Sequence, residues 1–235
     1  MAAAVGTLSA CSAGHTAVVD TTQAGSDTAP SALTVASTSA ATSLDFTTTG
    51  GAAIPAVLMD NVYETLVRID EDGSITPGLA KEWDISKDAK TYTFHLRDDV
   101  TFSDGTPFTS TSVKNNFDRI IRLGSLSYIG ASHLRGYQRT ETPDAHTAVV
   151  VFDGPNAQFL QAATTQTLGM LADATLGKDP KDVARGDVIG SGPYVFSEYR
   201  QGQYVLLTRR EDYAWGSDAR SNKGPARFRT VIADR

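Results

Sequence analysis

The sequence of 235 residues predicts a mixed α/β (α+β) fold, and three observations near its middle support this class. Residues 91–97 alternate strictly between apolar and polar side chains, as a half-buried β-strand requires. A tight turn with the sequence SDGTPF follows at 103–108. From 109 to 124 the apolar residues recur at the spacing of an amphipathic helix. A strand, a turn and a helix are therefore predicted in direct succession, as in a mixed α/β fold.

The N-terminal third begins with a segment that is not expected to fold. Residues 12–32 are rich in Thr, Ser, Ala and Gly and hold few bulky apolar side chains, so they cannot offset the entropy of ordering and predict a disordered tether. A short strand is expected at 33–36, followed by a polar loop. Pro55 then fits the first turn of a helix, whose apolar residues at helical spacing are Leu58, Val62, Leu66 and Ile69.

The central region is the most regular part of the sequence. A turn at 72–73 and the segment 74–77 lead to Trp83, which is predicted to be buried, and to a polar turn at 86–90. The alternating strand follows, with its apolar face formed by Tyr92, Phe94 and Leu96, and a second short strand is expected around Val100 and Phe102.

The amphipathic helix has a recognisable start and end. Thr109 and Thr111 are both candidates for its N-cap after Pro107, because a threonine side chain can accept a hydrogen bond from a free helical N–H. Gly124 is a plausible stop. The predicted buried stripe consists of Val113, Phe117, Ile120 and Ile121.

The C-terminal half alternates short elements with turns. Residues 128–139 give no clear prediction, whereas 146–152 are apolar on both faces and predict a central strand. A short helix is expected after Pro155, a charged loop at 177–187, and a Gly-Pro turn within 189–196. The last elements are a hairpin turn at 201–203, a strand at 204–209 and a strand-like segment at 228–232.

Composition and charge exclude some functions. The net charge is −6, and most of it lies in residues 1–67, which contain five acidic residues and no Lys or Arg, while the remainder is close to neutral. The sequence thus lacks the clustered basic side chains that bind nucleic acid, and no nucleic acid partner is expected. No stretch approaches the ~18 consecutive apolar residues of a membrane span.

The sequence gives no pattern for catalysis, metal binding or a cofactor. The four histidines, with one cysteine, form no pair at metal-ligand spacing. Gly190-Ser191-Gly192 is not a nucleophile elbow, because position 189 is Ile where that motif needs Gly, and a structural turn is the simpler interpretation. The charged pairs at 98–99, 209–210 and 211–212 are interpreted as solvated turn residues. We therefore do not expect an enzyme.

Cys11 lies in the sequence Leu8-Ser9-Ala10-Cys11, which looks like a bacterial lipobox. In such a motif the cysteine thiol is acylated, and two or three acyl chains anchor a protein firmly to a membrane. Residues 1–8 hold no basic residue and are too short for a complete signal, so 1–11 is interpreted as a partial lipoprotein signal. The alternative is an incidental cysteine in a flexible tail.

Three motifs together resemble a known family. The run GLAKEWDISKDAKTYTFHLRDDVTFSDGTPFTSTSVKNNFDR at 78–119, the GSGPY element at 190–194 and REDYAW at 210–215 resemble the family 5 solute-binding proteins, the extracytoplasmic receptors of peptide and nickel ABC importers. This resemblance implies a periplasmic-binding-protein-like type II main lobe, formed here by 33–56 and 182–235, with an inserted accessory α+β domain at 57–181. Members are much longer, so their second lobe is missing from this sequence.

The resemblance also implies a function and a site. It predicts the substrate-binding component of an ABC importer, with oligopeptides as the expected solute, permease subunits as partners and an extracytoplasmic, lipid-anchored location. Metal chelates, opines and sugars remain open as ligands. The predicted ligand-binding residues are Thr48, Thr49, Gly50, Asn61 and Tyr63.

Alternatives to this assignment stay open. The loop holding Thr48 can also be a flexible polar loop, and Asn61 and Tyr63 can also serve packing between lobe and accessory domain. The whole chain can be a truncated, non-transporting fragment or interaction module, or an exported hydrolase with Ser, His and Asp in a cleft. Without the second lobe we expect an unpaired sheet edge, exposed apolar surface and marginal stability or association.

The lipobox interpretation predicts that Cys11 decides where the protein partitions. Replacing Cys11 by Ser removes the acceptor of the acyl chains, so the protein should move from the membrane fraction to the soluble fraction. Cell fractionation followed by immunoblotting measures this, with Ser12→Ala as the control. Unchanged partitioning of the Cys11→Ser variant would reject lipidation.

Overall fold

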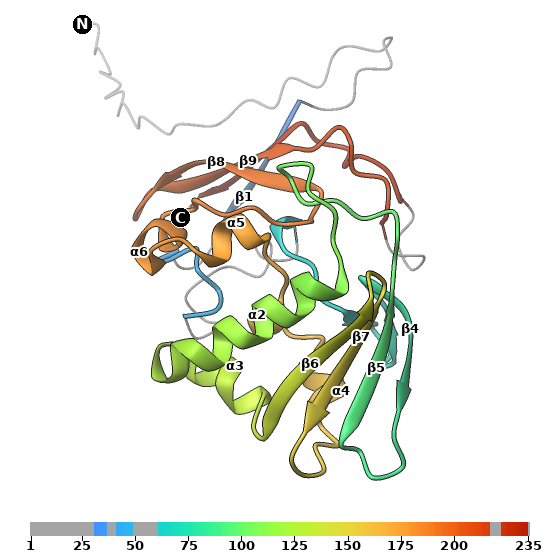
Figure 1. Ribbon diagram of the computed structural model, residues 1–235. Coiled ribbons are helices and arrows are strands. Elements are labelled where there is room, and N and C mark those ends of the chain that lie inside the picture. Colours follow the sequence, from blue (N-terminus) through green and yellow to red (C-terminus); the bar gives the residue numbers. More distant parts are fainter. Residues whose placement is uncertain (1–30, 37–40, 49–60, 217–221, 235) are drawn as a thin grey trace, which may run out of the picture.

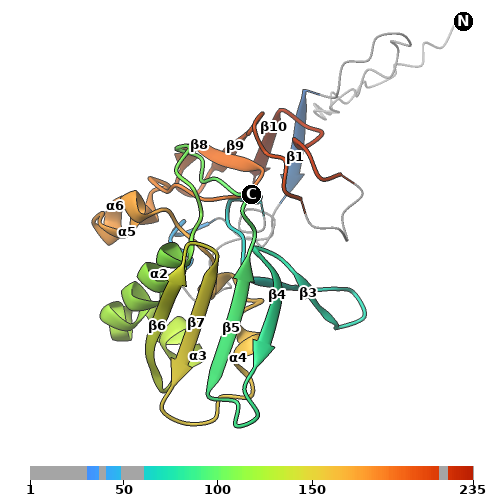
Figure 2. The same ribbon diagram turned by 45° about the vertical axis from the view of Figure 1, so that its right-hand side comes forward.

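The computed structural model describes residues 31–36, 41–48, 61–216 and 222–234. Its described part contains two four-stranded sheets, each with its own hydrophobic core (Figures 1 and 2). We call the sheet that holds the first and last strands the terminal sheet, and the other the central sheet. No helix in the described part is long and apolar enough to cross a membrane.

The terminal sheet joins the two ends of the described chain. Its strands are β1 (Ala32–Ala36), β10 (Thr230–Asp234), β9 (Tyr204–Arg209) and β8 (Tyr194–Arg200), in that spatial order. β1 pairs parallel to β10, and the other pairs are antiparallel. The strand predicted at 33–36, the turn at 201–203 and the strand at 204–209 are confirmed, whereas the last strand lies two residues later than predicted.

The central sheet is antiparallel throughout, in the order β4 (Ala80–Ile85), β5 (Thr91–Leu96), β7 (Thr147–Phe152) and β6 (Tyr137–Asp144). The alternation predicted for β5 is confirmed, because its apolar side chains are buried and the intervening ones are only partly covered. The central position predicted for β7 is confirmed as well. Trp83 on the edge strand β4 is half-buried rather than fully buried, and it packs on the outside of the core.

Helix α2 (Ser110–Leu123) lies across β6 and β7 and also contacts α5 (Asp173–Leu176) (Figure 1). It begins in a capping box formed by Thr109 and Ser112 and ends at Gly124, which has a φ of 53°. Of the predicted stripe, Ile121 is the exception with 42% exposure. It follows buried Ile120 by a single residue, a rotation of ~100° that turns its side chain away from the core.

Short elements connect the two sheets. Strands β2 (Val67–Ile69) and β3 (Ile75–Pro77) form a two-stranded ribbon. The segment without a clear prediction forms α3 (Tyr128–His133) and the start of β6. The remaining short helices are η1 (Gly124–Ser127), α4 (Phe159–Ala162), η2 (Gln166–Leu168) and α6 (Pro180–Ala184).

The helix predicted from Pro55 to Ile69 is wrong at its C-terminal end. Residues 49–60 lie outside the described residues, and 61–62 are helical, but the chain then becomes extended. The carbonyl groups of Thr65 and Leu66 accept hydrogen bonds from the amides of Leu79 and Ala80, and Val67 pairs with Pro77. Backbone pairing with a distant segment thus overrides the local helical periodicity.

Two further predictions are corrected. The segment containing Val100 and Phe102 forms only an isolated bridge between Thr101 and Pro107, because it folds back on itself in the turn that precedes α2. The charged loop predicted at 177–187 contains the helix α6. Its N-cap Asp179 accepts a hydrogen bond from the amide of Lys181, and Pro180 occupies the first turn, where a missing N–H carries no penalty.

Gly190 and Gly192 allow two backbone segments to touch. A Cβ atom at Gly190 would lie 2.1 Å from the Val62 carbonyl oxygen, and one at Gly192 would lie 2.5 Å from that of Asn61. The amide of Gly192 donates to Val62 O at 3.0 Å. The structural role predicted for the Gly-Ser-Gly turn therefore has a direct steric reason.

This close approach predicts a position-specific effect of alanine. Gly190→Ala forces the two backbones apart, and overpacking of this kind destabilises a protein by about 1–3 kcal/mol. Gly154→Ala is the matched control, because a Cβ atom there meets nothing within 4 Å. Urea unfolding of both variants measures the free energy of unfolding, and equal losses would contradict the steric explanation.

Candidate functional site

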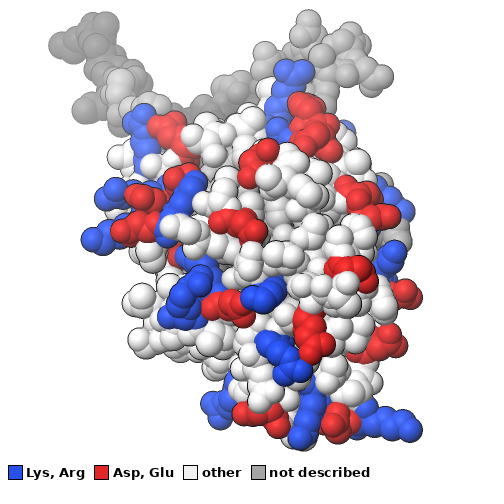
Figure 3. Space-filling model, in the orientation of Figure 1, with Lys and Arg blue, Asp and Glu red and all other residues white. Residues whose placement is uncertain are grey.

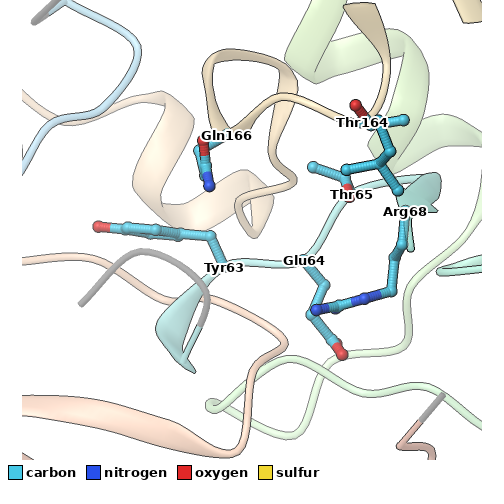
Figure 4. Close-up of a pocket in the computed structure, with 7 residues that line it drawn as sticks. Tyr63, Glu64, Thr65, Arg68, Thr164 and Gln166 are labelled. Carbon is cyan, nitrogen blue, oxygen red and sulfur yellow. The ribbon is translucent and has the colours of Figure 1, made fainter. Parts of the chain in front are cut away.

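A polar cavity lies where the chain passes from the terminal sheet to the central sheet (Figure 4). Its volume is about 100 Å³, and one wall is the segment 63–69 that leads into β2. The opposite wall is the turn between α4 and η2. The lining residues are Tyr63, Glu64, Thr65, Arg68, Ile69, Thr164 and Gln166.

Glu64 is the most constrained of these residues. Its side chain is buried, and three donors from distant parts of the chain hold its carboxylate. Tyr213 Oη donates to Oε1 at 2.8 Å, while Trp215 Nε1 and Ser191 Oγ donate to Oε2 at 3.0 and 2.9 Å. The carboxylate therefore joins the segment 63–69 to the segment before β8 and to the segment after β9.

The burial of Glu64 has an electrostatic consequence. Loss of hydration raises the pKa of its carboxyl above the ordinary value, although the bonds from Trp215, Tyr213 and Ser191 and the charge of Arg68 act in the opposite direction. Desolvation disfavours the charged form of a buried acid, whereas donors aimed at the carboxylate favour it. The raised pKa means that burial is the larger effect here.

Arg68 supplies the positive charge of the cavity. Figure 4 shows its guanidinium turned toward the Glu64 side chain, whose two oxygens are already occupied by the three donors. Within the described part of the chain, Arg68 forms no ion pair within 4 Å. Its planar set of N–H donors matches the geometry of a carboxylate group.

Tyr63 lies beside Glu64, but its ring points in another direction (Figure 4). Its hydroxyl donates to Leu44 O at 3.0 Å, and its ring packs on Phe46 with a centroid distance of 4.2 Å. Burial raises the pKa of the Tyr63 hydroxyl well above its usual value, so it stays protonated as a donor. Tyr63 thus fixes the loop 43–48 and also lines the cavity.

The loop 43–48 takes part in a buried charge pair. Arg119 of α2 lies with one guanidinium nitrogen 3.4 Å from Asp45 Oδ2 and donates from the other to Thr47 Oγ1 at 2.6 Å. Thr48 follows this pair directly and is half-buried, with its amide donating to Asp45 O at 3.3 Å.

The structure describes only some of the predicted site residues. Tyr63 lines the cavity, Thr48 lies in the adjoining loop and Asn61 is half-buried just before the cavity wall. Thr49, Gly50 and Cys11 lie outside the described residues. Whether these residues bind a ligand or an acyl chain remains a prediction.

Sequence reasoning missed the buried charged residues. Glu64 is the sole charge in the run Val-Tyr-Glu-Thr-Leu-Val, and that isolation was the available signal. Arg210 was interpreted as a solvated turn residue, which is wrong. It is buried, donates to the carbonyl oxygens of Thr101 and Phe102 at 3.1 Å each, pairs with Asp212 at 2.7 Å and stacks over Trp215.

The hydrolase alternative has a specific residue to consider. Ser191 is fully buried, and its hydroxyl donates to Glu64; within the described residues it has no histidine partner. A serine nucleophile needs a general base within hydrogen-bond reach and access to substrate. Within the described residues, Ser191 therefore takes part in a structural hydrogen bond to Glu64.

The surface offers two further features. Two overlapping shallow grooves of about 410 and 540 Å³ lie around His133 and Asn156. On the face seen in Figure 3, basic and acidic side chains are interspersed. Several charged residues of the described part form pairs, for example Lys114 with Asp118 at 2.6 Å. This mixed distribution contrasts with the single-sign patches that attract polyanions.

Comparison with known proteins places the chain in a family. A family model described as bacterial extracellular solute-binding proteins, family 5 Middle, matches residues 74–233, and the chain belongs to this family. This agrees with the motif resemblance in the sequence. The family matches are to solute-binding proteins and not to enzymes.

Individual relatives agree with this assignment. The probable D,D-dipeptide-binding periplasmic protein DdpA of Escherichia coli K12 is 31% identical over 68% of this chain and 34% of its own length. The nickel-binding periplasmic protein of the same strain is 32% identical over 66% of this chain and 29% of its own length. The chain thus spans about a third of the length of these curated relatives.

A solved structure shows the same fold. The ABC transporter-associated periplasmic binding protein DppA from Helicobacter pylori, in complex with peptide STSA, superimposes with a TM-score of 0.70 and 26% identity. The superposition covers 87% of this chain and 42% of that protein. The predicted periplasmic-binding-protein-like fold is therefore confirmed.

The buried carboxyl of Glu64 predicts a specific dependence of stability on pH. Because its pKa is higher in the folded than in the unfolded state, its contribution to stability is full at low pH and declines as pH rises through the folded-state pKa. The variant Glu64→Gln does not titrate. The difference in free energy of unfolding, wild type minus Glu64→Gln, should therefore fall as pH rises from below 4.5 toward neutrality.

Urea unfolding at a series of pH values measures this difference. Asp88→Asn is the matched control, because the exposed Asp88 has a lowered pKa and its variant should show the opposite trend. A difference for Glu64→Gln that grows with pH would mean that the three donors, rather than burial, control this carboxyl.

Proposed function

We propose that this chain forms part of the solute-binding component of an ABC importer for oligopeptides, which captures its ligand outside the cytoplasmic membrane and delivers it to permease subunits. The observation that carries the proposal is family membership together with relatives whose names specify peptides, one of them seen with a bound peptide. The chain spans about a third of its curated relatives, so this concerns the activity of a larger assembly.

The polar cavity supports the proposal chemically. A peptide brings a carboxylate, an ammonium group and main-chain amides, which need precisely placed charged and hydrogen-bonding partners. The Arg68 guanidinium can receive a carboxylate, and Thr164 and Gln166 add polar atoms on the opposite wall. We propose Thr48, Asn61 and Tyr63 as ligand-binding residues next to this wall, and Thr49 and Gly50 with them.

A nickel chelate is the second candidate ligand, because a relative of similar identity is a nickel-binding protein. Among the described residues, no three His, Cys, Asp or Glu side chains gather as a metal site. A nickel site would therefore need donors other than these described side chains, and a chelating small molecule is one source of them. Opines and sugars stay open as ligand classes, and a similar solved structure, 26% identical to this chain, is a binding protein in complex with agropinic acid.

The proposed location is extracytoplasmic, with Cys11 as the site of a lipid anchor. The periplasmic relatives and the family description support an extracytoplasmic location. A tethered receptor stays close to its permease, which raises the effective concentration of the loaded receptor at the membrane.

A thermal-shift and calorimetry experiment tests the ligand class. The probes are tri-alanine, tri-alanine with a C-terminal amide, and nickel with histidine, each added to the full chain alone and together with any polypeptide that supplies a second lobe. A ligand at 100 times its dissociation constant stabilises the folded state by about 2.7 kcal/mol. Tri-alanine should raise the melting temperature, and the amide should raise it less.

Variants test the part played by the cavity. Arg68→Gln should weaken tri-alanine binding by about tenfold, since a hydrogen bond to a charged group contributes ~1.5–3 kcal/mol before solvent screening. Arg135→Gln is the matched control, because Arg135 is an exposed arginine in one of the grooves near His133. No stabilisation by either peptide in any combination would overturn the peptide assignment, and a shift with nickel and histidine alone would replace it.

A further inference from the structure

A charged side chain joins the two hydrophobic cores of the molecule. Helix α2 packs on the central sheet through Val113, Phe117 and Ile120. Leu44 and Phe46, by contrast, belong to the core of the terminal sheet. Arg119, on the same helix, reaches out of the first core and contacts the loop 43–48 of the second, across 72 and 74 residues of sequence.

The contact is a network of buried groups. The Arg119 side chain is 4% exposed and that of Asp45 is fully buried. One guanidinium nitrogen lies 3.4 Å from Asp45 Oδ2, and the other donates to Thr47 Oγ1 at 2.6 Å. Asp45 Oδ1 in turn accepts from the Thr47 amide at 2.9 Å and from its hydroxyl at 2.5 Å.

This network fixes the shape of the turn that ends at Thr48. The Thr47 amide depends on the Asp45 carboxylate, and the Thr48 amide and hydroxyl both point to the Asp45 carbonyl. A buried carboxylate without a positive partner is strongly destabilised. The orientation of Asp45, and with it the turn, therefore depends on the guanidinium of Arg119.

Two further bonds that hold the loop are neutral. Tyr63 Oη donates to Leu44 O at 3.0 Å, and the Leu44 amide donates to Ala184 O at 2.8 Å. Both act at Leu44, the N-terminal end of the turn. Arg119 acts at its C-terminal end, directly before Thr48.

The same face of α2 also holds the chain near the opposite cavity wall. Asn116, three residues before Arg119, donates to Leu171 O at 2.8 Å and accepts from the Leu171 amide at 3.0 Å. Residues three apart on a helix share a face. Two buried polar side chains of one helix thus fix two loops, and only Arg119 of this pair contacts the loop that carries Thr48.

We infer that Arg119 is a positioning residue for ligand binding: it holds the turn Asp45–Thr48 in its binding conformation from the helix that packs on the central sheet. The inference rests on the proposed function in one respect, the assignment of Thr48 as a ligand contact. The control of the turn by Arg119 is a property of the free protein and can be measured without a ligand.

Hydrogen–deuterium exchange with mass spectrometry measures the turn directly. In Arg119→Met, the amides of 43–48 should exchange at least about tenfold faster than in the wild type, because local opening is no longer opposed by the ion pair. Thr47→Val removes only the hydroxyl that Arg119 contacts and should give a smaller increase. In both variants, the amides of 91–96 in β5 should keep their protection.

Asn116→Ala is the matched control for general destabilisation. It removes three buried hydrogen bonds, two with Leu171 and one with Ser112 O, and should lower the melting temperature, while exchange of 43–48 stays within about twofold of the wild type. If Arg119→Met does not fold, the double variant Arg119→Met, Asp45→Asn removes the uncompensated carboxylate and should show the same fast exchange of 43–48. Wild-type exchange of this segment in Arg119→Met or in the double variant would overturn the inference.

Binding of tri-alanine separates the inference from the proposed function. Arg119→Met should bind the peptide at least about tenfold more weakly, because the turn is then not ordered in the free protein. The free-energy cost of ordering it must be met when the peptide binds. Arg119→Lys, which keeps the charge without the planar fork, should recover part of the affinity. Faster exchange with unchanged affinity would overturn the positioning role. Absence of peptide binding in the wild type would instead reject the proposed ligand, and exchange would still decide whether Arg119 holds the turn.

Discussion

The carboxylate of Glu64 is the interaction on which the arrangement of the molecule most depends. It is buried at the passage between the two sheets, and its three donors come from residues 127, 149 and 151 positions away in sequence. Trp215 Nε1 is a donor that can accept nothing in return, so its position requires an acceptor at the site of Glu64. A single acidic side chain thus sets the relative placement of segments that local propensity leaves independent.

The surroundings of Glu64 show that polar contacts complete this junction. Arg210 lies over the Trp215 ring at 5.1 Å and binds two carbonyl groups before α2, so the segment after β9 is tied to the loop that starts the helix. On the other side, Gly190 and Gly192 bring their backbone against residues 61–62. Directional hydrogen bonds and close backbone contact restrict geometry more than apolar packing does, because each donor and acceptor has a preferred direction.

The sequence predicted the parts of this structure that depend on local pattern. The alternation of β5, the interior position of β7 and the cap and stop of α2 follow from residues within one element, and they were predicted correctly. The segment 65–69 was predicted incorrectly, since its backbone pairs with residues 75–80 and this pairing overrides the local helical periodicity. Asp45, Glu64, Arg119 and Arg210 were missed as buried groups because charged residues are usually exposed, and only a distant partner makes their burial favourable. Motif resemblance identified the family, but it could not locate these partners.

Polar junctions of this kind have a consequence for ligand binding. A ligand loses affinity for every loop and side chain that must be ordered when it binds, at roughly 0.5–1.5 kcal/mol for each flexible side chain. In this chain the cavity wall at 63–68 is fixed by Glu64 through three distant donors, and the turn before Thr48 is fixed by Arg119. These parts of the proposed site are therefore ordered before any solute arrives. For the proposed function, the interaction energy of a solute with this wall then contributes to affinity rather than to folding the wall itself.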